Sequence, residues 1–398
     1  AVRGYFGGHD SNGWDYANSP LQTGSTFKIM ALAAALQQGI SLDTNYSSAP
    51  YQLPGSDLVT NVGGGCGVCD LREATKQSLN TSYLRLQHDL KNGTQDTADM
   101  AHALGVARSL PGIEETLTEN GKQPFEGVVL GQYQSRPLDM ATAMSTLANQ
   151  GVWHNPHFVQ RVENAAGEVL YEHPTDEGER RVSANVANNV LEAMAPVAAW
   201  SNGSLAGGRT SASQTGTTQL GDSGTNKDTW MVGATPQLAT SVWVGTADNT
   251  SAIFDQYGGI MYGAGAPTKI WKSVLDNSLA DQEFQQFPSA YPVRFGTVSA
   301  GGGAPAYNPG GGSGGQGAQN YTGPAQDGAP EEEASPAPAE TPDAGHDAPP
   351  QPPENQGGNN GNGGNRGNGG GNNEPARPEA PSLDDFFGRE GGLADLLG

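Results

Sequence analysis

The chain has 398 residues, with 20 Lys and Arg against 42 Asp and Glu, so its formal net charge is -22 and its pI is about 4.5. Such an acidic surface repels phosphates, which argues against nucleic acid as a partner. No apolar run approaches the roughly 20 residues needed to span a bilayer, and no charged and then apolar start indicates a signal peptide. The chain begins with Ala1 directly in a strand-like stretch, so we expect a fragment of a longer, exported protein.

The composition divides the chain in two. All six Trp and nearly all the long apolar runs lie before residue 290, which is enough for one sizeable core. The rest is rich in Gly, Pro, Asn, Gln and acidic residues and cannot bury enough surface to offset its ordering entropy. We predict a folded domain over residues 1–290 and a disordered acidic tail over 291–398. Residues 382–398 have apolar side chains at loosely helical spacing, and they either fold in a partner's groove or stay unstructured.

The first elements lead to a long apolar segment. Residues 1–18 alternate aromatic residues with Gly, Asp and Asn, which predicts a strand and a turn. After Gly24 follows a run rich in Ala, Leu and Met that stops at Gly39, which predicts a buried central helix. Ser25 begins this helix, and Lys28 lies one turn later on the same face.

A hydroxyl beside an amine forms a nucleophile and its base. The amine becomes a useful base when burial lowers its pKa toward neutrality, and the start of a helix offers N–H groups for a developing oxyanion. The alternative is a purely structural role, in which Ser25 caps the helix and Lys28 extends toward solvent. That alternative would be preferred if the S-x-x-K pattern stood alone.

Next comes a loop rich in Pro and Gly that ends in Cys66 and Cys69. This spacing suits a small disulfide loop, half of a zinc site or a redox pair. No second Cys pair and no βαβ pattern accompany it, which disfavours zinc and thioredoxin-like chemistry. In an exported chain we expect a structural disulfide that braces the loop ahead of the following helices.

Ser78 and Asn80 lie at the junction of two predicted helices, 71–77 and 81–90. The alternative reading is that Ser78 only caps the second helix. Later patterns predict helices over 96–105, 137–150, 185–200 and 267–280, and hairpins over 158–171 and 229–245. His154 and His157 lie in a loop without a nearby third ligand, so we expect surface residues and no metal site.

A third pattern, residues 213–218 (SQTGTT), leads toward the second hairpin. Around the three patterns, residues 13–28 (GWDYANSPLQTGSTFK), 78–83 (SLNTSY) and 226–245 (NKDTWMVGATPQLATSVWVG) resemble the transpeptidase domain of bifunctional, class A penicillin-binding proteins of an actinobacterial kind. The resemblance covers most of residues 1 to about 285. Penicillin-binding proteins and class A β-lactamases share the ordered S-x-x-K, S-D-N and K-T-G set.

The resemblance implies an α/β fold in which helices flank both faces of an antiparallel sheet, as in serine β-lactamases and D,D-peptidases. An all-helical subregion would carry Ser25, Lys28, Ser78 and Asn80. The site would be a groove between that subregion and the strand that starts near Gln214. The resemblance also implies an extracytoplasmic protein of the cell envelope, with a membrane anchor and a glycosyltransferase domain ahead of this segment.

The implied function is D,D-transpeptidation of peptidoglycan stem peptides that end in D-alanyl-D-alanine, with β-lactams as inhibitors that stop at the acyl-enzyme. Ser25 would attack with Lys28 as its base, and the backbone N–H groups of Ser25 and Thr217 would hold the oxyanion. Ser78 would relay a proton to the leaving amine, and Asn80 would hold Lys28 and the substrate's amide. This chemistry requires neither a metal nor an organic cofactor.

The third motif departs from the family because Gln214 stands where Lys is expected. That Lys would face the substrate's terminal carboxylate, to which Thr215 and Thr217 would offer hydroxyls, and Gly216 would let the substrate backbone approach the strand edge. Replacing a charged hydrogen bond by a neutral one costs on the order of ten- to thirtyfold in affinity or acylation rate. Arg209 and Lys227 are the nearby cations in sequence.

Two other functions stay open. A hydrolase of the same fold, a D,D-carboxypeptidase or β-lactamase, would use water in place of the acceptor amine. A catalytically weak cell-wall binding or scaffold protein is suggested by Gln214 and would bind substrate without a stable covalent adduct. Partners of the tail, in the cell wall or in the divisome or elongation machinery, form a further expectation.

Overall fold

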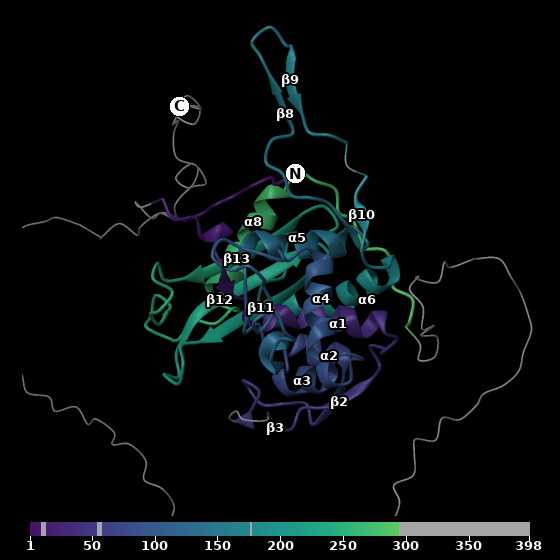
Figure 1. The fold of residues 1–398 in the computed structure, drawn as a ribbon, viewed down its shortest axis with the longest axis vertical. Helices are drawn as coiled ribbons and strands as arrows, with labels where there is room; N and C mark the ends of the chain where they lie inside the picture. Colours follow the sequence, from purple (N-terminus) through teal and green to yellow (C-terminus); the bar gives the residue numbers. More distant parts are fainter. Residues whose placement is uncertain (9–12, 54–57, 176, 294–398) are drawn as a thin grey trace, which may run out of the picture. The chain divides into compact units, whose positions relative to one another are not determined.

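The computed structural model describes residues 1–8, 13–53, 58–175 and 177–293 (Figure 1). Apart from its first three residues, the predicted tail lies outside these described ranges, so the boundary near residue 290 stays a prediction. The helices are α1 (Lys28–Gln37), α2 (Leu71–Lys76), α3 (Asn80–His88), α4 (Thr94–Leu104), α5 (Pro137–Ala148), α6 (Ala184–Met194), α7 (Val197–Trp200) and α8 (Ala266–Ser278).

The main sheet has three antiparallel strands in the order β11 (Ala212–Gln219), β12 (Asn226–Ala234) and β13 (Ala239–Gly245). Side chains of a strand alternate between its two faces. Accordingly Trp230 and Val232 of β12 join the core cluster that contains α1, α5 and α6, while Met231 packs with Trp271 and Leu275 of α8. Helices therefore cover both faces of an antiparallel sheet, which confirms the predicted α/β class.

Short strands complete the fold. The pairs are β1 (Leu21–Gln22) with β6 (Gln134–Ser135), β2 (Asn45–Ser47) with β5 (Val68–Asp70), β3 (Tyr51–Gln52) with β4 (Leu58–Val59), β7 (Val152–Trp153) with β10 (Glu179–Arg180), and β8 (Arg161–Glu163) with β9 (Val169–Glu172). The last pair is the hairpin predicted over 158–171. All five pairs are antiparallel.

Helix α1 lies at the centre of the helical region, where it packs against α3, α4 and α6 (Figure 1). Every residue from Lys28 to Leu36 is buried, which follows from a run that is apolar on nearly all sides. The helix ends shortly before Gly39, whose φ of +88° suits glycine. The prediction of a buried central helix is confirmed, although Ser25 itself lies in the 3-10 turn Gly24–Phe27 that precedes α1.

Two predicted elements are wrong. Residues 1–8 and 13–18 contain no strand, only the helical turn Tyr16–Asn18, because Asp15 accepts from the backbone of Asn18 and turns the chain. The single helix predicted over 185–200 is divided into α6 and α7. Pro196 lies between them and has no N–H for the helical ladder.

No helix in the described ranges combines the length and apolar character that crossing a membrane would need.

Candidate active site

Two glycines let the turn that carries Ser25 pack directly on the edge strand β11. A Cβ atom on Gly24, whose φ is +58°, would fall 2.6 Å from the backbone nitrogen of Thr217. One on Gly216 would fall 2.2 Å from the carbonyl oxygen of Thr23. The sheet backbone at Thr217 is thereby brought beside the residue that precedes Ser25. The space on the Cβ side of Gly216 is filled by the chain's own Thr23. The approach of the substrate backbone to the strand edge at Gly216 stays a prediction.

Lys28 joins the first two motifs through one nitrogen atom. Its Nζ lies 2.8 Å from Ser25 Oγ, 2.8 Å from Asn80 Oδ1, 3.1 Å from Ser78 Oγ and 2.6 Å from the carbonyl oxygen of Ser78. Residues that are 50 and 52 positions apart in the chain thus meet on one amine. The structure brings together all four residues that the sequence nominated for the chemistry.

The chemical nature of these partners determines where the protons of Lys28 go. The amide oxygen of Asn80 and the backbone oxygen of Ser78 can only accept hydrogen bonds. A neutral amine has two N–H bonds and one lone pair. If both N–H bonds serve these two oxygens, the lone pair is left for a hydroxyl. Ser25 Oγ at 2.8 Å is the nearer of the two hydroxyls, so Lys28 is arranged to accept a proton from Ser25.

Burial shifts Lys28 toward its neutral form. The residue has no exposed surface, and this desolvation lowers the pKa of its amine from 10.5 to about 7. The apolar run of α1 that buries the amine is therefore also the cause of its basic chemistry near neutral pH.

Ser78 has a left-handed backbone conformation, which is uncommon for residues other than glycine. Its φ is +55°, in the left-handed region, at the turn between α2 and α3. Helix α3 has Leu79 as its N-cap, so Ser78 does not cap the helix as the alternative reading proposed. Its hydroxyl and its carbonyl both face Lys28 instead.

Gln214 makes its hydrogen bonds within the chain. The side chain is fully buried, its Nε2 donates to the carbonyl of Thr75 at 3.4 Å, and its Oε1 accepts from the backbone of Thr215 at 3.0 Å. Thr215 and Thr217 remain partly exposed. The Thr217 hydroxyl accepts from the Gly263 N–H at 3.1 Å, which leaves its own proton available to donate.

Neither cation near the third motif in sequence is available to replace the missing Lys. Arg209 is buried and donates to the carbonyls of Leu279 and Gln282. Lys227 donates to Asp228 and Asn249. Both side chains are engaged outside the three motifs.

Cys66 and Cys69 form a disulfide, and Cys69 lies in β5, paired with Tyr46 of β2. This closed loop lies ahead of the second motif, as the sequence indicated. Sequence reasoning missed Thr60 and Asn61, which lie ahead of this closed loop and contact α3. An Asn in a Gly-rich loop has no sequence pattern that would single it out.

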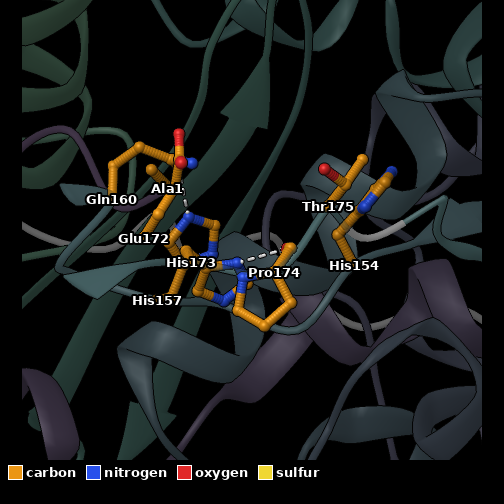
Figure 2. Close-up of a pocket in the computed structure, with 8 residues that line it drawn as sticks. All are labelled: Ala1, His154, His157, Gln160, Glu172, His173, Pro174 and Thr175. Carbon is orange, nitrogen blue, oxygen red and sulfur yellow. Dashed lines mark hydrogen bonds between the residues drawn. The ribbon is translucent and has the colours of Figure 1, made fainter. Parts of the chain in front are cut away.

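The histidine loop contributes to a separate cavity. Figure 2 shows His154, His157 and His173 around this cavity together with Gln160 and Glu172. The rings of His157 and His173 stack with centroids 3.6 Å apart, and His157 Nε2 lies 2.8 Å from Gln160 Oε1. Among the described residues no three His, Cys, Asp or Glu side chains are grouped to hold a metal ion. None of the lining residues belongs to the three motifs.

The chain is similar to known proteins in both sequence and fold. Residues 8–274 match the model of the penicillin-binding protein transpeptidase domain. The chain is 50% identical over 312 residues to penicillin-binding protein 1A of Mycolicibacterium smegmatis, covering 77% of this chain and 40% of the relative. It is 49% identical over 298 residues to penicillin-binding protein 1A of Mycobacterium tuberculosis, covering 74% of this chain and 36% of the relative.

Among solved structures, the PonA1 protein from Mycobacterium tuberculosis in complex with penicillin V matches with a TM-score of 0.71 and 49% identity, over 74% of this chain and 78% of that one. The chain spans less than half the length of the two relatives named penicillin-binding protein 1A. The matched family region contains all three motifs. The chain belongs to the family of penicillin-binding protein transpeptidase domains.

Proposed function

We propose that this chain is a serine D,D-transpeptidase that cross-links peptidoglycan stem peptides and is acylated by β-lactams. The observation that carries the proposal is the arrangement of Lys28, whose buried amine meets Ser25, Ser78 and Asn80 at hydrogen-bonding distance. Family membership and the penicillin V complex of the PonA1 relative support the same reaction class.

In the first half of the reaction, Ser25 Oγ attacks the carbonyl carbon of the D-alanyl-D-alanine bond while its proton passes to Lys28 Nζ. The backbone N–H groups of Ser25 and Thr217 stabilise the negative charge on the carbonyl oxygen. The bond to the terminal D-alanine then breaks. Its amine takes the proton from Lys28 through the Ser78 hydroxyl, which lies 3.1 Å from Nζ.

In the second half, the amine of a neighbouring stem peptide attacks the acyl-enzyme ester. Lys28, neutral again, accepts the amine's proton, and Ser25 Oγ leaves and is reprotonated. A β-lactam follows only the first half, because its leaving amine stays tethered to the acyl group. Thr215 and Thr217 offer hydroxyls to the carboxylate of either substrate, with Thr217 oriented by Gly263.

The relatives named penicillin-binding protein 1A support an enzyme of the cell wall that acts outside the cytoplasm. We propose that the parent protein is held at the membrane by a segment absent from this sequence. Cell-wall or divisome and elongation partners of the tail belong to the same proposal, on the basis of its composition alone.

A product assay tests the reaction and separates it from hydrolysis. The chain is incubated with a pentapeptide ending in D-alanyl-D-alanine and an amine acceptor, and the products are separated by mass. The proposal predicts release of D-alanine together with the acceptor adduct, and neither product with Ser25→Ala. Release of D-alanine without an adduct would identify a carboxypeptidase. If no product depends on Ser25, the scaffold function remains.

A further inference from the structure

Helix α3 begins without a cap of its own. Its N-cap residue, Leu79, has no side-chain oxygen and makes no capping hydrogen bond. An N-cap side chain normally accepts from the N–H of the second or third helical residue, and without one these groups stay unsatisfied. The first residue of this helix is Asn80, which contacts Lys28. The orientation of Asn80 therefore depends on what holds the first turn of α3.

Asn61 supplies the missing cap from a different part of the chain. Its Oδ1 accepts from the backbone N–H of Thr81, the second residue of α3, at 3.1 Å. Its Nδ2 donates to the Thr81 hydroxyl at 2.9 Å and to the carbonyl of Ser48 at 2.9 Å. Both ends of the Asn61 amide are thus used to hold one turn of one helix.

The neighbouring residue completes this contact. The Asn80 side chain donates through Nδ2 to the carbonyl of Thr60 at 3.1 Å, while its Oδ1 accepts from Lys28. Because Thr60 and Asn61 are adjacent, one short segment fixes both the helix start and the amide that faces the catalytic amine. Rotation of the Asn80 amide would remove one of the acceptor-only partners that direct the lone pair of Lys28 toward Ser25.

The disulfide loop supports this segment through Ser48. The backbone N–H and the hydroxyl of Ser48 both donate to the carbonyl of Gly67, which lies between Cys66 and Cys69. A continuous set of hydrogen bonds therefore runs from the disulfide loop through Ser48 and Asn61 to α3. At the end of this set, Asn80 contacts Lys28, the base of the nucleophile.

We infer that Asn61 is a positioning residue of the acylation reaction, acting through Asn80 on Lys28. It does not touch the reacting atoms. The inference rests on the proposed function, because the step that Asn61 would influence is the transfer of the Ser25 proton to Lys28. It adds a residue that lies outside the three sequence motifs, in the segment ahead of the disulfide loop and linked to it through Ser48.

The test follows the rate of the penicillin adduct by intact mass across pH. Asn61→Ala should acylate roughly five- to tenfold more slowly, because losing a cap weakens the first helical turn by a free energy of that size and Asn80 then holds its orientation toward Lys28 less of the time. Its pH profile should move to lower pH, because an acceptor that stabilises the ammonium form of Lys28 is displaced. Asn61→Asp keeps the capping oxygen and should recover most of the rate, with its profile moved to higher pH by the added negative charge.

The matched control is Asn45→Ala, an exposed Asn in β2 whose side chain, among the described contacts, donates only to the Asp43 carbonyl. It should acylate like the unsubstituted chain. Amide hydrogen exchange gives a readout that is independent of activity, since the Thr81 amide should exchange faster in Asn61→Ala.

The inference is overturned if Asn61→Ala keeps the rate and pH profile of the unsubstituted chain, or if the rate falls with thermal stability while the profile stays in place. Unchanged exchange at Thr81 would also overturn it. If the unsubstituted chain forms no adduct while Thr81 exchanges faster in Asn61→Ala, the proposed function fails and the cap remains as a structural contact only.

Discussion

At the scale of single residues, Lys28 combines two effects that point to the same chemistry. Burial in an apolar helix lowers the pKa of its amine, and acceptor-only partners on two sides leave its lone pair for a hydroxyl. Either effect alone would be weaker. In a buried amine without these oxygens, the lone pair would have no fixed direction. An exposed amine with these oxygens would stay protonated at neutral pH.

The lowered pKa of Lys28 predicts the pH dependence of acylation. Since the base is active in its neutral form and its pKa is about 7, the acylation rate should rise with pH, reach half its maximum near pH 7 and then level off. The adduct rate measured from pH 5 to 9 tests this. Lys28→Arg, which stays protonated throughout this range, should acylate at no pH. A rate that rises only toward pH 10 would mean that Lys28 keeps its ordinary pKa.

The same shift has a consequence for stability. The folded chain releases the Lys28 proton near pH 7, whereas the unfolded chain holds it until about pH 10.5. Between these values the unfolded state binds more protons, so this group makes the free energy of unfolding rise with pH. Below pH 7 its burial cost is present in full.

At the scale of elements, β11 connects the sheet to the helical region by contacts of its own. Gly216 lies against Thr23, and Gln214 donates to the carbonyl of Thr75 in α2. That same carbonyl accepts from the backbone N–H of Ser78 at 3.0 Å. The third motif is thereby linked to the turn that holds Lys28, through a neutral side chain in this protein.

A positive charge at this position should improve the reaction with anionic substrates. Gln214→Lys is expected to raise the penicillin acylation rate about tenfold, because its charge would attract the substrate's carboxylate, whereas the amide of Gln214 makes its hydrogen bonds within the chain. Gln214→Met, which keeps the volume but makes no hydrogen bonds, should not acylate faster than the unsubstituted chain. Equal rates for Gln214→Lys and the unsubstituted chain would show that the site does not depend on this charge.

At the scale of the whole molecule, local patterns predicted most elements. The apolar run of α1 and the hairpin formed by β12 and β13 are set by neighbouring residues, and the structure has both where they were predicted. Ser25 and Lys28 share one turn, so their contact was also predictable. The resemblance to known transpeptidases, not the local pattern, selected Ser78 and Asn80.

What the sequence could not supply are contacts between distant segments. The capping of α3 by Asn61 joins residues 20 positions apart, and the burial of Gln214 depends on α2, which lies far from β11 in the chain. The missed division between α6 and α7 was local, because Pro196 was visible in the sequence. The turn that Asp15 caps in place of the strand predicted over residues 1–18 was local as well, whereas the stacking of Tyr16 on Trp243 joins distant segments that no local pattern connects.

The central claim is that Ser25 is the nucleophile and Lys28 its base, and intact-mass spectrometry after incubation with penicillin tests it most directly. The unsubstituted chain should gain the mass of one penicillin, with the adduct on the peptide that contains Ser25. Ser25→Ala should gain none, and Lys28→Arg should gain none on the same timescale, while both variants keep the circular dichroism of the folded chain. An adduct that persists in folded Ser25→Ala, or no adduct in the folded unsubstituted chain, would contradict the claim.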